Sequence, residues 1–192
     1  MADEPPDLDG RLVDAVERLG DAARVMLRRA AAAEGLSPTQ AQLLLRITAA
    51  AEGTGVLAAR LEVSAPTVSD AVHTLARKGL AERGDPPDTR AWRATVQGRD
   101  VAQRLRHWRD PLLAALGAHP TEAKATTLAS LLVAIAELNL GGHISTARTC
   151  LTCRFFRGDP YGAAWCALLR APLASETLRV DCPDHRARVD TA

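Results

Sequence analysis

Hydrophobic positions recur every three or four residues through most of this chain, which is the period of an α-helix with one apolar face. The first such stretch runs from about residue 11 to residue 33 and stops at Gly35. The next opens at Ser37-Pro38, where a capping hydroxyl precedes a proline in the first helical turn. This second stretch is apolar on several sides, so the pattern predicts an amphipathic helix followed by a helix that lies inside a domain.

Residues 54–95 combine two helical patterns with two short strand-like runs. In the second helix, capped by Ser64 and closed by Gly79, one arc is apolar: Val68, Ala71, Val72 and Leu75. The remaining surface of that helix carries Pro66, Thr67, Ser69, Asp70, His73, Thr74 and Arg77. The helices alone fit an ordinary αα-hairpin, but the strand-like runs flank a Gly/Pro/Asp loop and so predict a winged helix-turn-helix. One side of the second helix packs, and the other can enter a DNA groove.

Three ordered segments, LAARLEVSAPTVSDAVHTLARKGLAER, DPPDTR and TVQGR, resemble the MarR family of multiple antibiotic resistance type regulators. The resemblance covers about residues 36–138. It implies that the second helix enters the major groove, and that Asp88 and Arg90 at the wing tip bring an arginine to the minor groove. Many members have a basic residue where this chain has Asp70. Phosphates repel a carboxylate, unless it accepts from a cytosine amino group or pairs with a neighbouring cation.

Two further helical stretches follow the wing. Thr95 caps a helix that should bend at Pro111, and Pro120 precedes a helix that ends at Gly141. Together with the amino-terminal helix, these apolar stripes exceed what a winged domain needs to cover its own core. They predict a homodimer, whose two-fold symmetry would match a palindromic operator in double-stranded DNA.

The charge of the chain gives little support to nucleic-acid binding. The formal net charge is only +1, and residues 36–96 hold seven Lys/Arg against six Asp/Glu. The acidic amino terminus lacks the pattern of a secretory signal, and no apolar run approaches the length of a membrane span. We therefore expect a cytoplasmic protein, in which cysteines are metal ligands or redox groups rather than disulfides.

All four cysteines lie in the last 43 residues, from Cys150 through Cys153 and Cys166 to Cys182. The spacing is C-x2-C-x12-C-x15-C, and metal binding could supply about 10 kcal/mol or more to organise so short a segment. Four thiolates suit a tetrahedral zinc ion or an iron–sulfur cluster, and zinc sites more often have two close pairs. Since only the first pair is close here, the spacing favours iron.

The run C-x2-C-R-F-F and the later Trp165-Cys166-Ala167-Leu168 resemble the cluster-binding part of high-potential iron–sulfur proteins. The resemblance covers about 35 residues and implies a [4Fe-4S] cluster shielded by aromatic side chains. It departs from that family in loop lengths and at Cys182-Pro183. The alternative is a zinc site formed by Cys150, Cys153, Cys182 and His185, with Cys166 as a packed thiol.

The sequence thus predicts a mainly α fold with a small β-wing, long dimerisation helices and a short metal-binding carboxyl-terminal extension. Its predicted parts are an amino-terminal dimerisation helix (1–35), the winged helix-turn-helix (36–96), dimerisation helices (97–142) and a cysteine tail (143–192). The predicted function is a DNA-binding regulator, by resemblance a repressor, whose tail senses redox state or iron.

Two other functions fit the same residues: a repressor that responds to an unknown small-molecule effector and carries structural zinc, and an electron-transfer or partner-binding module without DNA affinity. An enzyme is not expected, because the chain has no phosphate-cradling glycine loop, no H-E-x-x-H pattern and no nucleophile elbow.

Overall fold

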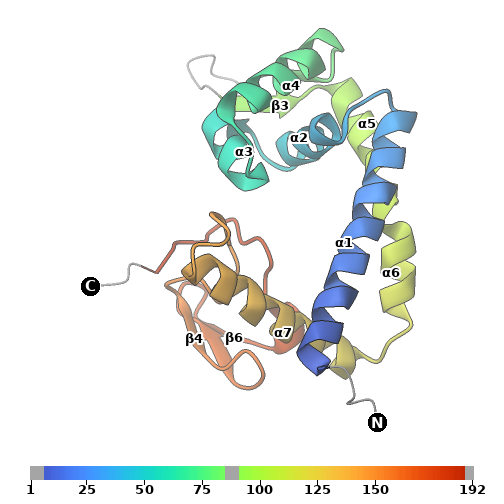
Figure 1. Ribbon diagram of the computed structural model, residues 1–192. Helices are drawn as coiled ribbons and strands as arrows, with labels where there is room; N and C mark the ends of the chain where they lie inside the picture. Colours follow the sequence, from blue (N-terminus) through green and yellow to red (C-terminus); the bar gives the residue numbers. More distant parts are fainter. Residues whose placement is uncertain (1–6, 85–90, 189–192) are drawn as a thin grey trace, which may run out of the picture. The chain divides into compact units, whose positions relative to one another are not determined.

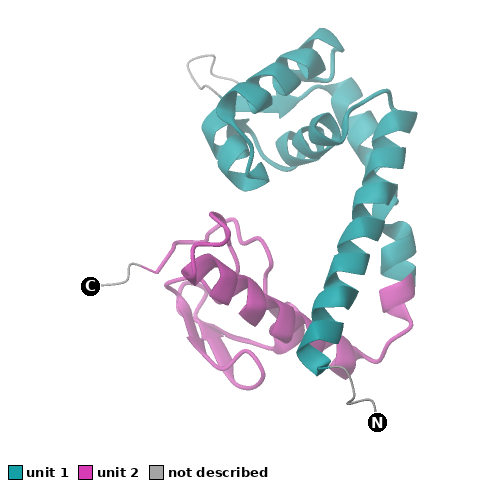
Figure 2. Cartoon of the chain, viewed as in Figure 1, with its two compact units in different colours: residues 1–114 teal, residues 115–192 magenta. Residues whose placement is uncertain are grey.

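The computed structural model describes residues 7–84 and 91–188 (Figure 1). The chain divides into two compact units, residues 1–114 and residues 115–192 (Figure 2). Each unit has its own apolar core, and the two cores share no residue. The units are therefore described separately.

The first unit is helical with a small sheet. Its elements, in chain order, are α1 (Leu8–Ala33), α2 (Pro38–Ala49), β1 (Glu52–Gly53), α3 (Thr54–Leu61), α4 (Ala65–Arg77), β2 (Ala81–Arg83), β3 (Ala91–Ala94), α5 (Val96–Arg106), the 3-10 turn η1 (His107–Arg109) and α6 (Asp110–Gly117). The order helix, helix, strand, helix, helix, strand, strand is that of a winged helix, as the sequence predicts.

Capping side chains fix where the central helices begin. The Ser37 hydroxyl accepts the Gln40 backbone N–H while the Gln40 side chain accepts the Ser37 N–H, which completes a capping box on α2. Ser64 caps α4 through the Thr67 N–H, and Thr95 caps α5 through the Gly98 N–H. These helix starts were predicted from the sequence and are confirmed.

Helix α2 lies at the centre of this unit, in contact with α1, α4 and α5. Its Leu43 and Leu44 side chains are fully buried, and Ile47 is almost so. A helix surrounded on several sides must be apolar on several sides, which explains why its sequence pattern is broad rather than a single stripe.

The wing is a three-stranded antiparallel sheet in the order β1-β3-β2. Trp92 of β3 stands opposite Glu52 on one side and Arg83 on the other, and its side chain is buried. The strands on both sides of the predicted wing loop are thus confirmed. The loop tip, with Asp88 and Arg90, lies outside the described residues.

The helix after the wing is interrupted where Pro111 was expected to bend it. Helix α5 ends at Arg106, and a 3-10 turn leads into α6, which begins one residue before the proline. A proline cannot donate the hydrogen bond that a continuous α-helix would require at its position, so the break has a local cause.

The second unit joins one long helix to the cysteine tail. It consists of α7 (Thr121–Leu140), the antiparallel strands β4 (Phe156–Gly158), β5 (Ala164–Cys166) and β6 (Ala171–Leu173), and the 3-10 turn η2 (Ser175–Thr177). On α7, Ala129 and Leu132 are fully buried in a cluster with Phe156 and Leu178. The helix that the sequence assigns to dimerisation thus supplies a core for the tail.

Helix α7 is also the one described helix with the length and mean hydropathy, 1.3, of a possible membrane span. The sequence analysis predicts no such run. Of the apolar window in α7, 17% is buried inside the unit, namely Ala129, Leu132 and Ala136, so core packing uses only part of the apolar surface of this helix.

Gly98, in the first turn of α5, has no room for a side chain. A Cβ at this position would meet the carbonyl oxygen of Leu80. We expect Gly98→Ala to lower the free energy of unfolding by about 1–3 kcal/mol through overpacking. Gly10→Ala is the matched control, because nothing lies within 4 Å of its Cβ position and alanine should stabilise the helix by about 0.5–1 kcal/mol. Urea midpoints at one protein concentration check both, and equal midpoints for the two variants would contradict the packing argument.

Candidate nucleic-acid interface and cysteine site

Helix α4 has one buried face and one exposed face. Val68, Val72 and Leu75 are completely buried and Ala71 is 9% exposed, which confirms the predicted apolar arc. The residues that the sequence assigns to DNA binding are exposed or half-buried on the other face: Pro66, Thr67, Ser69, Asp70, His73, Thr74 and Arg77. The helix therefore presents polar groups to solvent from a rigid support.

Hydrogen bonds along the helix hold several of these side chains. The Thr74 hydroxyl donates to the Asp70 carbonyl oxygen at 2.9 Å, and the Arg77 guanidinium donates to the Thr74 hydroxyl oxygen at 2.8 Å. Arg77 thus lies along α4 with further N–H groups available, since a guanidinium has five.

His73 connects the exposed face of α4 to the wing. Its ring stands edge-on to Trp92 with 5.3 Å between ring centroids, and its Nδ1 lies 2.7 Å from the Ser69 carbonyl oxygen. The Arg83 guanidinium covers the same indole at 4.2 Å from the ring centroid. Trp92 therefore serves wing packing. The sequence did not indicate the contact with His73, because it joins residues 19 apart through the fold.

Two other cations near the wing already have partners, and only one of these partners is charged. Arg93 of β3 pairs with Glu82 of β2 at 3.1 Å, and Lys78 donates to the Gly35 carbonyl oxygen. Positive charge on this face consequently depends on few side chains, in keeping with the nearly neutral chain.

In the tail, two stretches of backbone pair and bring Cys150 beside Cys182. The Cys150 N–H donates to the Arg179 carbonyl oxygen at 3.0 Å, and the Cys182 N–H donates to the Arg148 carbonyl oxygen at 2.8 Å. These bonds run in both directions between residues 148–150 and 179–182, so they fix the two cysteines relative to each other.

Two more pairings place Cys153 and Cys166. Cys153 forms an antiparallel bridge with Ala187, and Cys166 of β5 stands opposite Phe156 of β4, which follows the C-x2-C turn. Every cysteine of the tail is thus held by backbone hydrogen bonds between segments that are distant in sequence.

The four thiols share one environment. All are free; Cys150 and Cys153 are buried and the other two are half-buried. Burial raises the pKa of the Cys150 thiol, the charges of Cys182, Cys153 and Cys166 act in the same direction, and the Arg179 backbone N–H, 3.2 Å from the Cys150 sulfur, opposes them. The structure therefore gathers all four predicted cysteines within electrostatic reach. Among residues 7–84 and 91–188, however, no three His, Cys, Asp or Glu side chains are grouped so that they could hold a metal ion.

His185, the alternative ligand, has a different partner. Its Nε2 lies 3.0 Å from the Thr152 hydroxyl oxygen, within hydrogen-bonding distance. The other charges that act on the Cys150 thiol come from cysteines and do not include His185.

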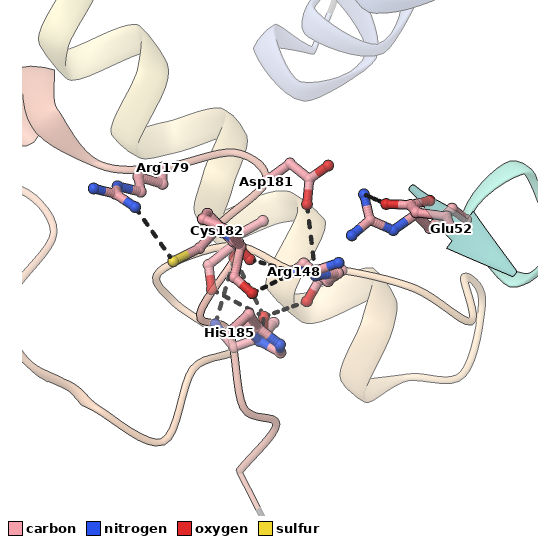
Figure 3. A network of polar contacts seen from close by, with 11 residues as sticks. Glu52, Arg148, Arg179, Asp181, Cys182 and His185 are labelled. Atoms are coloured by element: carbon pink, nitrogen blue, oxygen red, sulfur yellow. Dashed lines mark hydrogen bonds and ion pairs between the residues drawn. The ribbon is translucent and has the colours of Figure 1, made fainter. Parts of the chain in front are cut away.

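Two arginines that the sequence analysis did not select organise this site (Figure 3). Arg148 donates to the carbonyl oxygens of Cys182 and Pro183 at 2.7 and 2.9 Å and pairs with Asp181 at 3.6 Å. The Arg179 guanidinium approaches the Cys182 sulfur at 3.8 Å. The contacts of Arg148 join residues more than 30 positions apart, and the contact of Arg179 lies in a turn without a recognisable pattern. The one local signal for Arg148 is its position two residues before Cys150.

Comparison with known proteins supports the winged helix. The matching family model does not extend to the cysteine tail. Residues 34–91 match a family model described as MarR family. A MarR family transcriptional regulator from Silicibacter pomeroyi is 27% identical, with 69% of this chain and 92% of that chain covered and a TM-score of 0.57. A MarR family regulator from Rhodococcus sp. RHA1 is 19% identical, with coverage of 66% and 94% and a TM-score of 0.54, and shows the same fold. No curated protein matches the chain. Residues 34–91 are therefore similar to the MarR family, and the described helices and strands of this region have the order of a winged helix.

Proposed function

We propose that this protein is a MarR-type transcription regulator that binds a palindromic operator as a homodimer and acts as a repressor. The observation that carries the proposal is the two-faced helix α4: its apolar arc is buried while its polar face is open beside the β2–β3 wing. Such a helix fits the major groove of DNA, with its amino-terminal residues at the base edges.

The position of each side chain along α4 suggests whether it contacts bases or phosphates. Thr67, Ser69 and Asp70 lie near the amino-terminal end, where recognition helices reach base edges, and Asp70 is suited to accept a hydrogen bond from a cytosine amino group. Arg77 lies at the other end and suits a phosphate. His73, braced by Trp92, fixes the distance between the helix and the wing. Arg90 is proposed as the minor-groove residue of the wing tip.

Arg77 and Asp70 should affect binding in different ways. We expect Arg77→Gln to weaken binding to all duplexes alike and to lower the slope of log K against log salt by about 0.9 for each phosphate that the variant no longer neutralises. Asp70→Asn should instead change which operator variants are preferred. Fluorescence anisotropy on the upstream region of the gene and on random duplex measures both, with Arg170→Gln in the tail as control. If both variants keep the wild-type affinity for DNA and the wild-type preference among operators, α4 does not read DNA.

The homodimer is proposed from an apolar stripe that the described chain leaves uncovered. Leu8, Leu12, Val16 and Leu19 follow one side of α1, and each is more than half exposed. Further along the same side, Leu27 is buried against the core of the first unit. A stripe that is packed at one end and open at the other calls for a second apolar surface, and a copy of the same helix supplies one through two-fold symmetry.

Acidic residues on this stripe should separate the subunits. We expect Leu12→Glu with Val16→Glu to give a monomer in sedimentation velocity and to weaken operator binding by about a hundredfold or more, because the two half-sites are no longer bound together. Asp14→Gln with Glu17→Gln changes the opposite side of α1 and should leave the dimer intact. A dimer that survives the first pair of substitutions would show that α1 is not its interface.

For the tail, we propose a centre held by Cys150, Cys153, Cys166 and Cys182, with a [4Fe-4S] cluster as the bound group. Support comes from the pairings that converge on these four thiols and from the N–H and guanidinium groups of Arg179 directed at two of the sulfurs. Such donors stabilise thiolates, the form that binds metal. The donor set fits such a group in kind, while no three of these side chains stand together as a metal site in the part of the chain that the structure describes.

The proposed role of this centre is to sense redox state or iron in the cytoplasm. The bound group would tie residues 148–154 to residues 179–188, and its loss would leave backbone pairing and the hydrogen bonds of Arg148 and Thr152 to hold these segments. A change in the order of the tail is a physical route by which oxidation or metal loss could alter the dimer that binds the operator.

Two substitutions distinguish a cluster from zinc. If the cluster proposal holds, anaerobically purified protein is brown with about four irons per subunit, Cys166→Ser loses the iron, and His185→Gln keeps it. Structural zinc would give colourless protein that His185→Gln depletes and Cys166→Ser does not. Iron, sulfide and zinc contents with visible absorbance decide between them. Equal operator affinity of loaded and metal-free protein would refute the sensing role alone.

A further inference from the structure

Four exposed arginines meet on the surface of the tail: Arg154, Arg157, Arg186 and Arg188. We call this group the arginine patch. It belongs to neither the polar face of α4 nor the four thiols, and its members come from two segments that are about 30 residues apart. The fold therefore creates a concentration of charge that the linear sequence does not show.

The backbone register brings three members together. Cys153 stands opposite Ala187 in an antiparallel bridge, the Arg154 N–H donates to the Arg186 carbonyl oxygen at 2.8 Å, and the Arg188 N–H donates to the Thr152 carbonyl oxygen at 3.2 Å. Arg154, Arg186 and Arg188 are all exposed, so these paired backbone positions carry three cations to solvent.

Hydrogen bonds to carbonyl oxygens attach the other guanidiniums to the same segment. Arg157 donates to the Arg154 and Phe156 carbonyl oxygens at 2.6 and 2.8 Å, and Arg188 Nε donates to the Cys153 carbonyl oxygen at 3.4 Å. Neutral carbonyl groups orient the cations without cancelling their charge. None of the four arginines forms an ion pair with any residue in 7–84 or 91–188.

The tail is also the positively charged part of the chain. Residues 143–192 contain seven arginines against five acidic residues, which gives +2, whereas residues 1–142 contain 17 Lys/Arg against 18 Asp/Glu, which gives −1. Gathered like charges repel one another, so a surface that keeps four guanidiniums together without counterions from the described residues is suited to a polyanion.

We infer that the arginine patch binds the phosphate backbone of DNA as a second, sequence-independent contact surface of this protein. The inference rests on the proposed DNA-binding function. A guanidinium binds phosphate oxygens in a two-pronged geometry, and such contacts add affinity through counterion release without reading bases. The patch would supply the phosphate contacts that the nearly neutral winged helix provides sparingly.

Arg154→Gln with Arg186→Gln is the decisive variant. Within the described chain neither guanidinium donates a hydrogen bond. Arg154 lies over the Phe155 ring at 5.6 Å from its centroid, so far-UV circular dichroism checks that the fold survives the loss of this contact. Lys124→Gln with Arg170→Gln removes the same charge from exposed positions of the same unit outside the patch. Arg154→Lys with Arg186→Lys keeps the charge of the patch. Each protein is titrated with a random-sequence duplex and with the upstream duplex over a range of salt concentrations.

We expect the glutamine variant to lose affinity for both duplexes by the same factor. The slope of log K against log salt should fall by about 0.9 per phosphate contact, with the control pair unchanged and the lysine pair close to wild type. If the wild-type protein binds DNA and the glutamine variant has the same slope of log K against log salt, the DNA-binding role of the arginine patch is wrong and the proposed function stands. Failure of the wild-type protein to bind either duplex overturns the proposed function and this inference together. Loss of binding to phosphatidylserine vesicles with an unchanged DNA slope would assign the patch to a membrane surface instead.

Discussion

The burial of one side of α4 is the constraint on which the winged helix depends. Val68, Val72 and Leu75 have no exposed surface, so each contributes about 1.5–3 kcal/mol of burial and together they fix the rotation of the helix about its axis. That rotation alone decides which polar side chains face solvent. The indole of Trp92, between His73 and Arg83, then fixes the wing beside the helix. A rigid exposed face is thus a consequence of core packing rather than of the exposed residues themselves.

The sequence could predict those parts of the fold whose causes are local. Ser64 and Thr95 bond to N–H groups three residues away, and Pro111 interrupts its own helix, so a short window contains the whole cause. Arg148 and Arg179 could not be selected in this way, since their backbone carbonyl groups bond to cysteines 34 and 29 residues away. The wide apolar pattern of α7 predicts a dimer surface, and the structure packs part of that pattern against the tail, because periodicity shows that a face is buried and does not show what buries it.

The cysteine tail is held together by two kinds of force that respond to different conditions. Backbone pairing and the packing of Phe156 and Leu178 on α7 need no metal, and they bring the segments together. Burial, and after it the charges of the neighbouring cysteines, oppose the thiolate form of Cys150, as its raised pKa indicates. A bound cation centre would remove that opposition, so the tail is expected to be ordered without metal and more firmly ordered with it.

The antiparallel bridge between Cys153 and Ala187 also has a practical consequence for how the protein is handled. Residues 186–188 form the outer partner of the C-x2-C turn, so any protease that trims the chain before Arg186 would strip the backbone support from Cys153. Affinity tags and fluorescent labels are therefore better attached at the amino-terminal end, ahead of Asp7, where α1 begins with its own cap.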